Sequence, residues 1–146
     1  MSDQRAISLF EQLESQEQEV SREADRRLDS LLDWSIRSQD SCRMARIHSW
    51  RAHSHLVRGI LDSSMIELDK AKRAFQGACD SLHYMSIQGN LSATLLELGE
   101  FEAVVDVTQG SLALWNEDWP KATSRNGLLT NRAIAKAYMG DMDGAL

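Results

Sequence analysis

The chain has 146 residues, a net charge of −6 and a pI of about 5.2. That length suits one domain with a core of its own, and 26% charged and 42% hydrophobic residues are ordinary for a soluble globular protein. The acidic balance argues against nucleic-acid binding, which depends on clustered Lys and Arg. The arginines between residues 22 and 58 alternate with acidic residues, as on solvated helix faces, so no nucleic-acid partner is expected.

No apolar run approaches the roughly 20 residues of a membrane-spanning helix, and no apolar signal-peptide core follows the polar start of the chain. We therefore expect a cytoplasmic protein without membrane insertion. Cys42 and Cys79 lie far apart and outside any CxxC motif. They are interpreted as buried small apolar residues, and a disulfide between them is the alternative.

Apolar residues recur at three- and four-residue steps along the whole chain, and the only proline is Pro120. Both features favour helices. Residues 3–38 predict either one helix or two that are separated near Ser15–Ser21. Further helices are expected over 41–63, 68–82, 86–98, 101–115 and 122–139, and another is expected to begin at 143.

The four tryptophans divide into two pairs. Trp34 and Trp50 fall on apolar stripes and are predicted to be core residues. Trp115 and Trp119 flank the loop that Asn116, Asp118 and Pro120 predict. The second pair either anchors the neighbouring helix ends or forms an exposed contact patch.

One pattern recurs in three stretches, 59–71, 92–104 and 133–145. Each has a small residue, a helical run, a turn, and then acidic, apolar, acidic and small residues. Gly99 and Gly140 are the turn glycines of the second and third copies, and Ile66 takes that place in the first. The predicted turns are therefore 33 and 41 residues apart.

This pattern resembles the tetratricopeptide repeat, a helix-turn-helix unit of about 34 residues, from about residue 41 to the C-terminus. The small and aromatic positions of the family are matched in the first unit by Gly59, Ala71, Phe75 and Ala78. In the next unit the family's positions are matched by Leu91, Ser92, Leu95, Val104 and Ser111, and Thr108 stands where the family has an aromatic residue. The resemblance implies an all-α fold of antiparallel helix-turn-helix repeats, stacked in a right-handed α-solenoid.

The domain organisation follows from the same resemblance. Residues 1–40 are expected to form an N-terminal helical arm or a degenerate repeat. Residues 41–146 are expected to hold the repeats, with the last one truncated, which favours a fragment of a longer chain. An irregular helical bundle is the alternative architecture.

No motif for enzymatic chemistry is present, neither GxSxG, HExxH, a P-loop nor GxGxxG. His48, His53 and His55 invite a metal site, but His53 lies on a different helix face from the other two. His48 and His55 share a face but are about 10 Å apart along the axis. We therefore expect no catalytic residues, no metal and no cofactor in this segment.

In the tetratricopeptide family the first helices of the repeats line a concave groove, which receives a peptide or a partner helix. The resemblance assigns ten groove residues here: His53, Leu56, Ile60, Ser86, Asn90, Ala93, Glu97, Asn131, Ile134 and Tyr138. Asn90 and Asn131 occupy equivalent places, where an amide can donate to and accept from a peptide backbone. The alternative is that each asparagine bridges within its own repeat.

The resemblance implies a protein- or peptide-binding scaffold. Its long-period repeats are similar to those that precede diguanylate cyclase (GGDEF) or transcriptional-regulator output domains. We therefore expect the regulatory or sensory N-terminal region of a larger bacterial signalling protein. The alternatives are an oligomerisation module, which would form a homodimer, and a free-standing adaptor.

Overall fold

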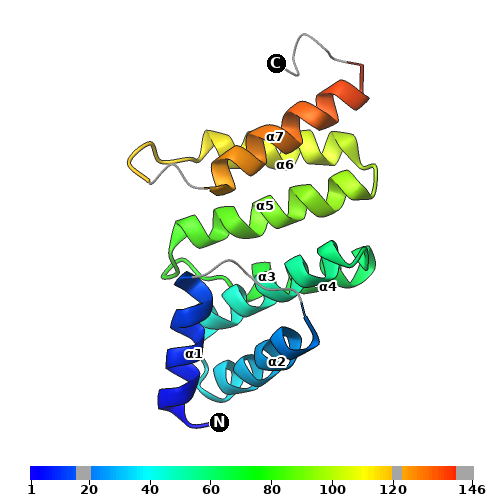
Figure 1. The fold of residues 1–146 in the computed structure, drawn as a ribbon. Coiled ribbons are helices and arrows are strands. Elements are labelled where there is room, and N and C mark those ends of the chain that lie inside the picture. Colours follow the sequence, from blue (N-terminus) through cyan, green and yellow to red (C-terminus); the bar gives the residue numbers. More distant parts are fainter. Residues whose placement is uncertain (16–20, 120–122, 141–146) are drawn as a thin grey trace. The chain divides into compact units, whose positions relative to one another are not determined.

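Every regular element in the computed structural model is a helix over the residues it describes, which are 1–15, 21–119 and 123–140 (Figure 1). The helices are α1 (Asp3–Ser15), α2 (Arg22–Arg37), α3 (Ser41–Val57), α4 (Leu61–Ala74), α5 (Ser81–Glu97), α6 (Phe101–Ala113) and α7 (Thr123–Tyr138). The predicted all-α class is confirmed for these ranges. None of the described helices combines the length and apolar character needed to cross a membrane.

The contacts divide the chain into two compact units, Met1–Cys79 and Asp80–Leu146. The first unit contains α1 to α4, with α3 packed against both α2 and α4. The second contains α5, α6 and α7, each in contact with the other two. The N-terminal arm expected over 1–40 therefore packs in the same compact unit as the first predicted repeat.

Residues 3–38 form two helices and not one. Ser21 has an extended backbone, with φ −152° and ψ 166°, and its hydroxyl accepts a hydrogen bond from the Ala24 N–H. It is therefore a side-chain N-cap that begins α2. The polar stretch between the helices falls on residues 16–20, and the last predicted helix begins at 143. Both lie outside the described residues, as does Pro120.

The turn of the first hairpin lies at Gly59, so the predicted helix over 41–63 is wrong at its C-terminal end. Gly59 has φ +77°, and its N–H donates to the Leu56 carbonyl while that of Ile60 donates to the His55 carbonyl. This bonding ends a helix with a left-handed residue, which glycine adopts without strain. Ile66, predicted to replace the turn glycine, lies exposed inside α4.

The same turn recurs in the second unit, which corrects the predicted repeat register. Gly99 has φ +77°, and the N–H groups of Gly99 and Glu100 donate to Leu96 and Leu95. Gly140 has φ +82°. The three turn glycines are 40 and 41 residues apart, in place of the predicted 33 and 41. A shift of 40 residues also superposes buried positions of α3–α4 on buried positions of α5–α6, namely Ile47 on Ile87, Ser64 on Val104 and Ala71 on Ser111.

The segment between α4 and α5 is a connection, so the predicted helix over 68–82 is wrong. Helix α4 ends at Ala74, and the Asp80 carboxylate accepts a hydrogen bond from the Leu82 N–H to begin α5. Ala78, matched to a small packing position of the second helix, is exposed in this connection. The error follows from the misplaced turn, because moving α4 towards the N-terminus also moves its end.

Cys42 and Cys79 form a disulfide, with their Cα atoms 5.4 Å apart. The interpretation of two buried reduced cysteines is therefore wrong, and the alternative holds. The bond joins the first turn of α3 to the end of the α4–α5 connection, two segments that only the hairpin fold brings together. Because disulfides persist in oxidising compartments, the cysteines no longer support a cytoplasmic setting.

Each unit has an aromatic core of its own. In the first unit Phe10, Trp34 and Trp50 pack with Ala6, Leu28, Leu31 and Ile47, so the predicted core role of Trp34 and Trp50 is confirmed. In the second unit Trp115 is buried with Met85 and Leu128. The Trp119 ring meets Trp115 edge-on at 5.1 Å. This pair anchors the end of α6, as the packing alternative predicted.

Candidate functional site

Seven of the ten predicted groove residues lie on two neighbouring helices of the second unit. Helix α5 carries Ser86, Asn90, Ala93 and Glu97 at steps of four, three and four residues, which place them on one face. Helix α7 carries Asn131, Ile134 and Tyr138 at steps of three and four. The two helices pack directly against each other, and Figure 1 shows them side by side. None of the seven side chains is buried, so all are accessible from solvent.

Two polar contacts join α5 to α7 along this face. The Ser86 and Ser124 hydroxyls are 3.4 Å apart. The Asn131 side-chain N–H donates to the Ser92 hydroxyl at 2.9 Å, and Ser92 is fully buried. Asn131 therefore bridges α7 to α5 of the preceding hairpin, which differs from the alternative of a bridge within its own repeat. One of its N–H groups is used in this way, while its partial exposure leaves the same side chain within reach of a ligand.

The two asparagines occupy equivalent positions by the corrected register. Asn90 and Asn131 are 41 residues apart, the same step that separates Gly99 from Gly140. Forty residues before Asn90 the first unit has Trp50, which is buried against Phe10 of α1 with the ring centroids 5.1 Å apart. The amide position is therefore specific to the second unit, and in the first unit it is filled by core packing.

The other three predicted residues belong to the first unit and are described apart from these seven. His53 and Leu56 are partly buried on α3. Ile60, expected on the first helix of its repeat, precedes α4 in the Gly59 turn and is exposed. The misplaced turn explains this difference too, because it extended the predicted first helix past residue 60.

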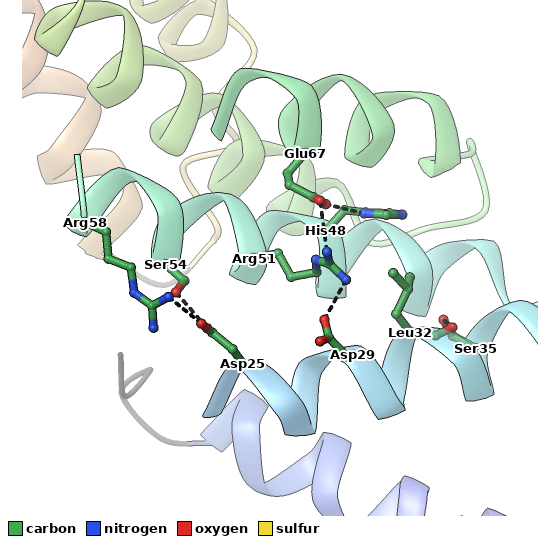
Figure 2. Close-up of polar contacts among 9 residues, drawn as sticks. All are labelled: Asp25, Asp29, Leu32, Ser35, His48, Arg51, Ser54, Arg58 and Glu67. Atoms are coloured by element: carbon green, nitrogen blue, oxygen red, sulfur yellow. Dashed lines mark hydrogen bonds and ion pairs between the residues drawn. The ribbon is translucent and has the colours of Figure 1, made fainter. Parts of the chain in front are cut away.

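An ionic network centred on the buried side chains of His48 and Glu67 was missed by the sequence reasoning (Figure 2). His48 Nδ1 of α3 lies 2.7 Å from Glu67 Oε2 of α4, and Arg51 contacts Glu67 at 3.3 Å and Asp29 of α2 at 2.9 Å. The Glu67 side chain is only 6% exposed. An ionised carboxylate can only accept, so His48 donates through Nδ1. The network ties three consecutive helices together.

Burial alone would raise the pKa of Glu67, but the hydrogen bond from His48 and the charge of Arg51 outweigh it, so the pKa lies below its ordinary 4.5. Glu67 is therefore ionised at neutral pH. Glu67 differs in its burial from Asp62 and Asp69 of the same helix, which are exposed. The signal that could have found it is its place two turns into α4, on the same face as Leu68 and Ala71, once Gly59 is recognised as the turn.

A second pair of contacts completes the network. The Asp25 carboxylate of α2 accepts from the Ser54 hydroxyl at 2.9 Å and pairs with Arg58 at 2.6 Å (Figure 2). Each of these carboxylates is neutralised by arginine, which suits a structural role better than general-base chemistry. Within the described ranges, no group of three His, Cys, Asp or Glu side chains is arranged to hold a metal ion.

Comparison with known proteins adds no assignment: no family model, no curated protein and no solved structure matches the chain.

Proposed function

We propose that this chain is a protein- or peptide-binding scaffold of tetratricopeptide-like hairpins, and that the α5–α7 face is its binding surface. The observation that carries the proposal is the pair Asn90 and Asn131, one repeat apart on neighbouring helices and both partly exposed. Packed helices lie about 8–10 Å apart, and an extended peptide advances about 3.3 Å per residue. Two such amides can therefore hydrogen-bond the backbone of one extended peptide about three residues apart.

We further propose that binding at this face regulates an output domain in a larger bacterial signalling protein. The support is the 40- and 41-residue steps between the turn glycines, which resemble the long repeats that precede diguanylate cyclase and regulator domains. A ligand regulates such a domain only if it binds one conformation of the repeats better than another.

The proposal is tested with a peptide selected on the whole chain from a displayed random library. Its affinity is measured by calorimetry for the wild type and for Asn90→Ala with Asn131→Ala. We expect the double variant to bind at least about tenfold more weakly, because two backbone hydrogen bonds are lost. It should also lose about 1 kcal/mol of stability, since buried Ser92 loses the hydrogen bond from Asn131.

Ser92→Ala is the matched control. It removes the same hydrogen bond between α5 and α7 but keeps both amides, so it should lose stability and still bind the peptide. Normal binding by the double variant contradicts the proposal, and so does failure of the library to yield any peptide. Light scattering that shows a dimer held by this face would favour the oligomerisation module instead.

A further inference from the structure

An exposed apolar cluster lies where α5 turns into α6 and where α7 ends; we call it the turn patch. It comprises the exposed Leu98, Ile134, Tyr138 and Met139, together with the partly buried Phe101. The Tyr138 side chain is 72% exposed, and its ring stacks on Phe101 with centroids 4.9 Å apart and planes 2° from parallel. Figure 1 shows the α5–α6 turn and the end of α7 at the same end of the second unit. Exposed apolar side chains that gather at one end of a unit are candidates for an interaction surface.

Acidic residues are the chain neighbours of the α5–α6 part of this patch. Glu97 precedes Leu98, and Glu100 and Glu102 flank Phe101 along the chain. All three are exposed, and within the described ranges no Lys, Arg or His pairs with them. Residues 80–146 hold nine acidic and four basic side chains, so they contribute −5 of the net charge of −6. The turn patch is therefore an apolar surface with an unneutralised acidic rim.

We propose that the turn patch docks a basic segment of a partner protein that carries one large aromatic or apolar side chain. The anchor side chain packs against the Phe101–Tyr138 stack, and neighbouring Lys or Arg side chains pair with Glu97 and Glu100. Arginine can also lie over the exposed tyrosine ring, where the ring quadrupole attracts a cation. Unpaired carboxylates beside an apolar surface select such a partner by repelling acidic segments.

This inference rests on the proposed function, because the patch continues the asparagine face. Ile134 and Tyr138 follow Asn131 on one face of α7, and Glu97 follows Asn90 and Ala93 on one face of α5. A peptide whose backbone is held by the asparagines can therefore reach the patch with its next residues. The asparagines bind any backbone, whereas the patch selects the side chains.

The test uses three synthetic peptides of equal length on the whole chain: tryptophan flanked by lysines, tryptophan flanked by glutamates, and alanine flanked by lysines. Fluorescence anisotropy is measured at low and at physiological ionic strength. We expect the first peptide to bind at least about tenfold more tightly than the other two. Its affinity should fall as salt is raised, because exposed charges are screened. Equal binding of the glutamate peptide overturns the inference, and so does failure of the lysine–tryptophan peptide to bind.

Variants of the chain locate the site. Tyr138→Ala should weaken the lysine–tryptophan peptide about tenfold, and the side chain is too exposed for its loss to unfold the unit. Glu97→Gln with Glu100→Gln should weaken it several-fold and reduce the salt dependence. Glu117→Gln with Asp118→Asn is the matched control, because it removes the same charge beyond the other end of α6.

The outcomes separate the two proposals. Equal weakening by the control pair shows that net charge alone attracts the peptide and overturns the inference. If the library of the preceding test selects acidic peptides that need Asn90 and Asn131, the scaffold function stands and the basic partner is wrong. A third outcome is that the chain forms a dimer, that Tyr138→Ala converts it to a monomer, and that no peptide binds. This outcome assigns the patch to a second copy of the chain and also overturns the inference.

Discussion

The hairpins α3–α4 and α5–α6 have the same turn and the same spacing of buried positions, yet they differ in where they place their charges. Forty residues after Arg51 and Glu67, the second hairpin has Leu91 and Val107. The first hairpin buries an ion pair, His48 with Glu67, and extends it through Arg51. The second buries only neutral polar side chains, those of Ser92, Thr94, Thr108 and Ser111, and leaves its acidic side chains on the surface.

This difference separates what the hairpin requires from what it tolerates. Small residues at the close approaches and a left-handed glycine at the turn are common to both hairpins. Interior polarity is free to vary, provided that each buried charge has a partner. The hairpin with unpaired surface charge is the one for which we propose a docking surface, and the hairpin with the buried ion pair is the better candidate for a purely structural part.

The largest expected effect comes from the disulfide, which only the first hairpin has. Cys42→Ser with Cys79→Ser should lower the free energy of unfolding of the first unit by about 3–4 kcal/mol, because the bond closes a loop of 37 residues. Hydrogen exchange on the whole chain measures both units at once. Amides of α5, α6 and α7 should keep their protection, and an equal loss there would contradict two separately stabilised units.

The next effect sharpens the contrast between the two interiors. Glu67→Val places the residue of the second hairpin into the first and leaves His48 and Arg51 without their acceptor. We expect a loss of about 3 kcal/mol in urea unfolding. Adding His48→Gln and Arg51→Leu should recover most of that loss of stability. These substitutions introduce the residues that the second hairpin has at the equivalent positions, Gln88 and Leu91. A triple variant no more stable than Glu67→Val would show that the two interiors are not interchangeable.

The same carboxylate sets the pH range of this loss. The folded-state pKa of Glu67 lies below the unfolded value of 4.5, so its contribution is complete above that value and is lost as the pH falls through the folded pKa. The difference in stability between wild type and Glu67→Gln should therefore be constant near neutral pH and shrink below about pH 4.5. A difference that persists unchanged in acid would contradict ionisation of this buried group.

The smallest effects test the shared turn. Gly59→Ala and Gly99→Ala should each cost about 1 kcal/mol, because φ is +77° at both and no atom lies within 4 Å of the added Cβ to cause a clash. Gln39 takes the same place between α2 and α3 with φ +54°, so Gln39→Gly should stabilise the chain by a similar amount. Thermal melts of the three variants measure this, and unequal costs at Gly59 and Gly99 would break the equivalence of the turns.

Local signals predicted much of the fold. The apolar periodicity predicted helices, and α6 and α7 differ from their predicted ranges by two residues or fewer at each end. The failure at Gly59 has a specific cause. In the sequence, a glycine within a helical pattern is compatible both with a small packing residue and with a left-handed C-terminal turn, and Gly59 was predicted to be a packing residue. The backbone conformation distinguishes them, because only the turn requires positive φ.

The positions of most of the predicted groove residues along their helices could be predicted from the sequence, but their contacts could not. Asn90 and Asn131 could be placed on successive equivalent helices because the recurring turn glycines Gly99 and Gly140 give the same 41-residue step. The hydrogen bond of Asn131 could not be predicted in this way, since it joins Asn131 to Ser92, 39 residues away in the sequence. Glu67 and His48 are likewise ordinary polar residues until α4 folds back on α3. The disulfide follows the same logic, since spacing alone left Cys42 and Cys79 open to either interpretation.

The sequence by itself determined the helical class and the turn glycines at Gly99 and Gly140, because both depend on neighbours within a few turns of helix. The repeat of those turns then placed the two asparagines one repeat apart. The tertiary structure alone decided which charges are buried and paired, which cysteines meet, and which apolar side chains remain exposed at Tyr138 and its neighbours. The physical reason is that burial and pairing depend on distances between helices, and the local pattern along one helix does not contain those distances.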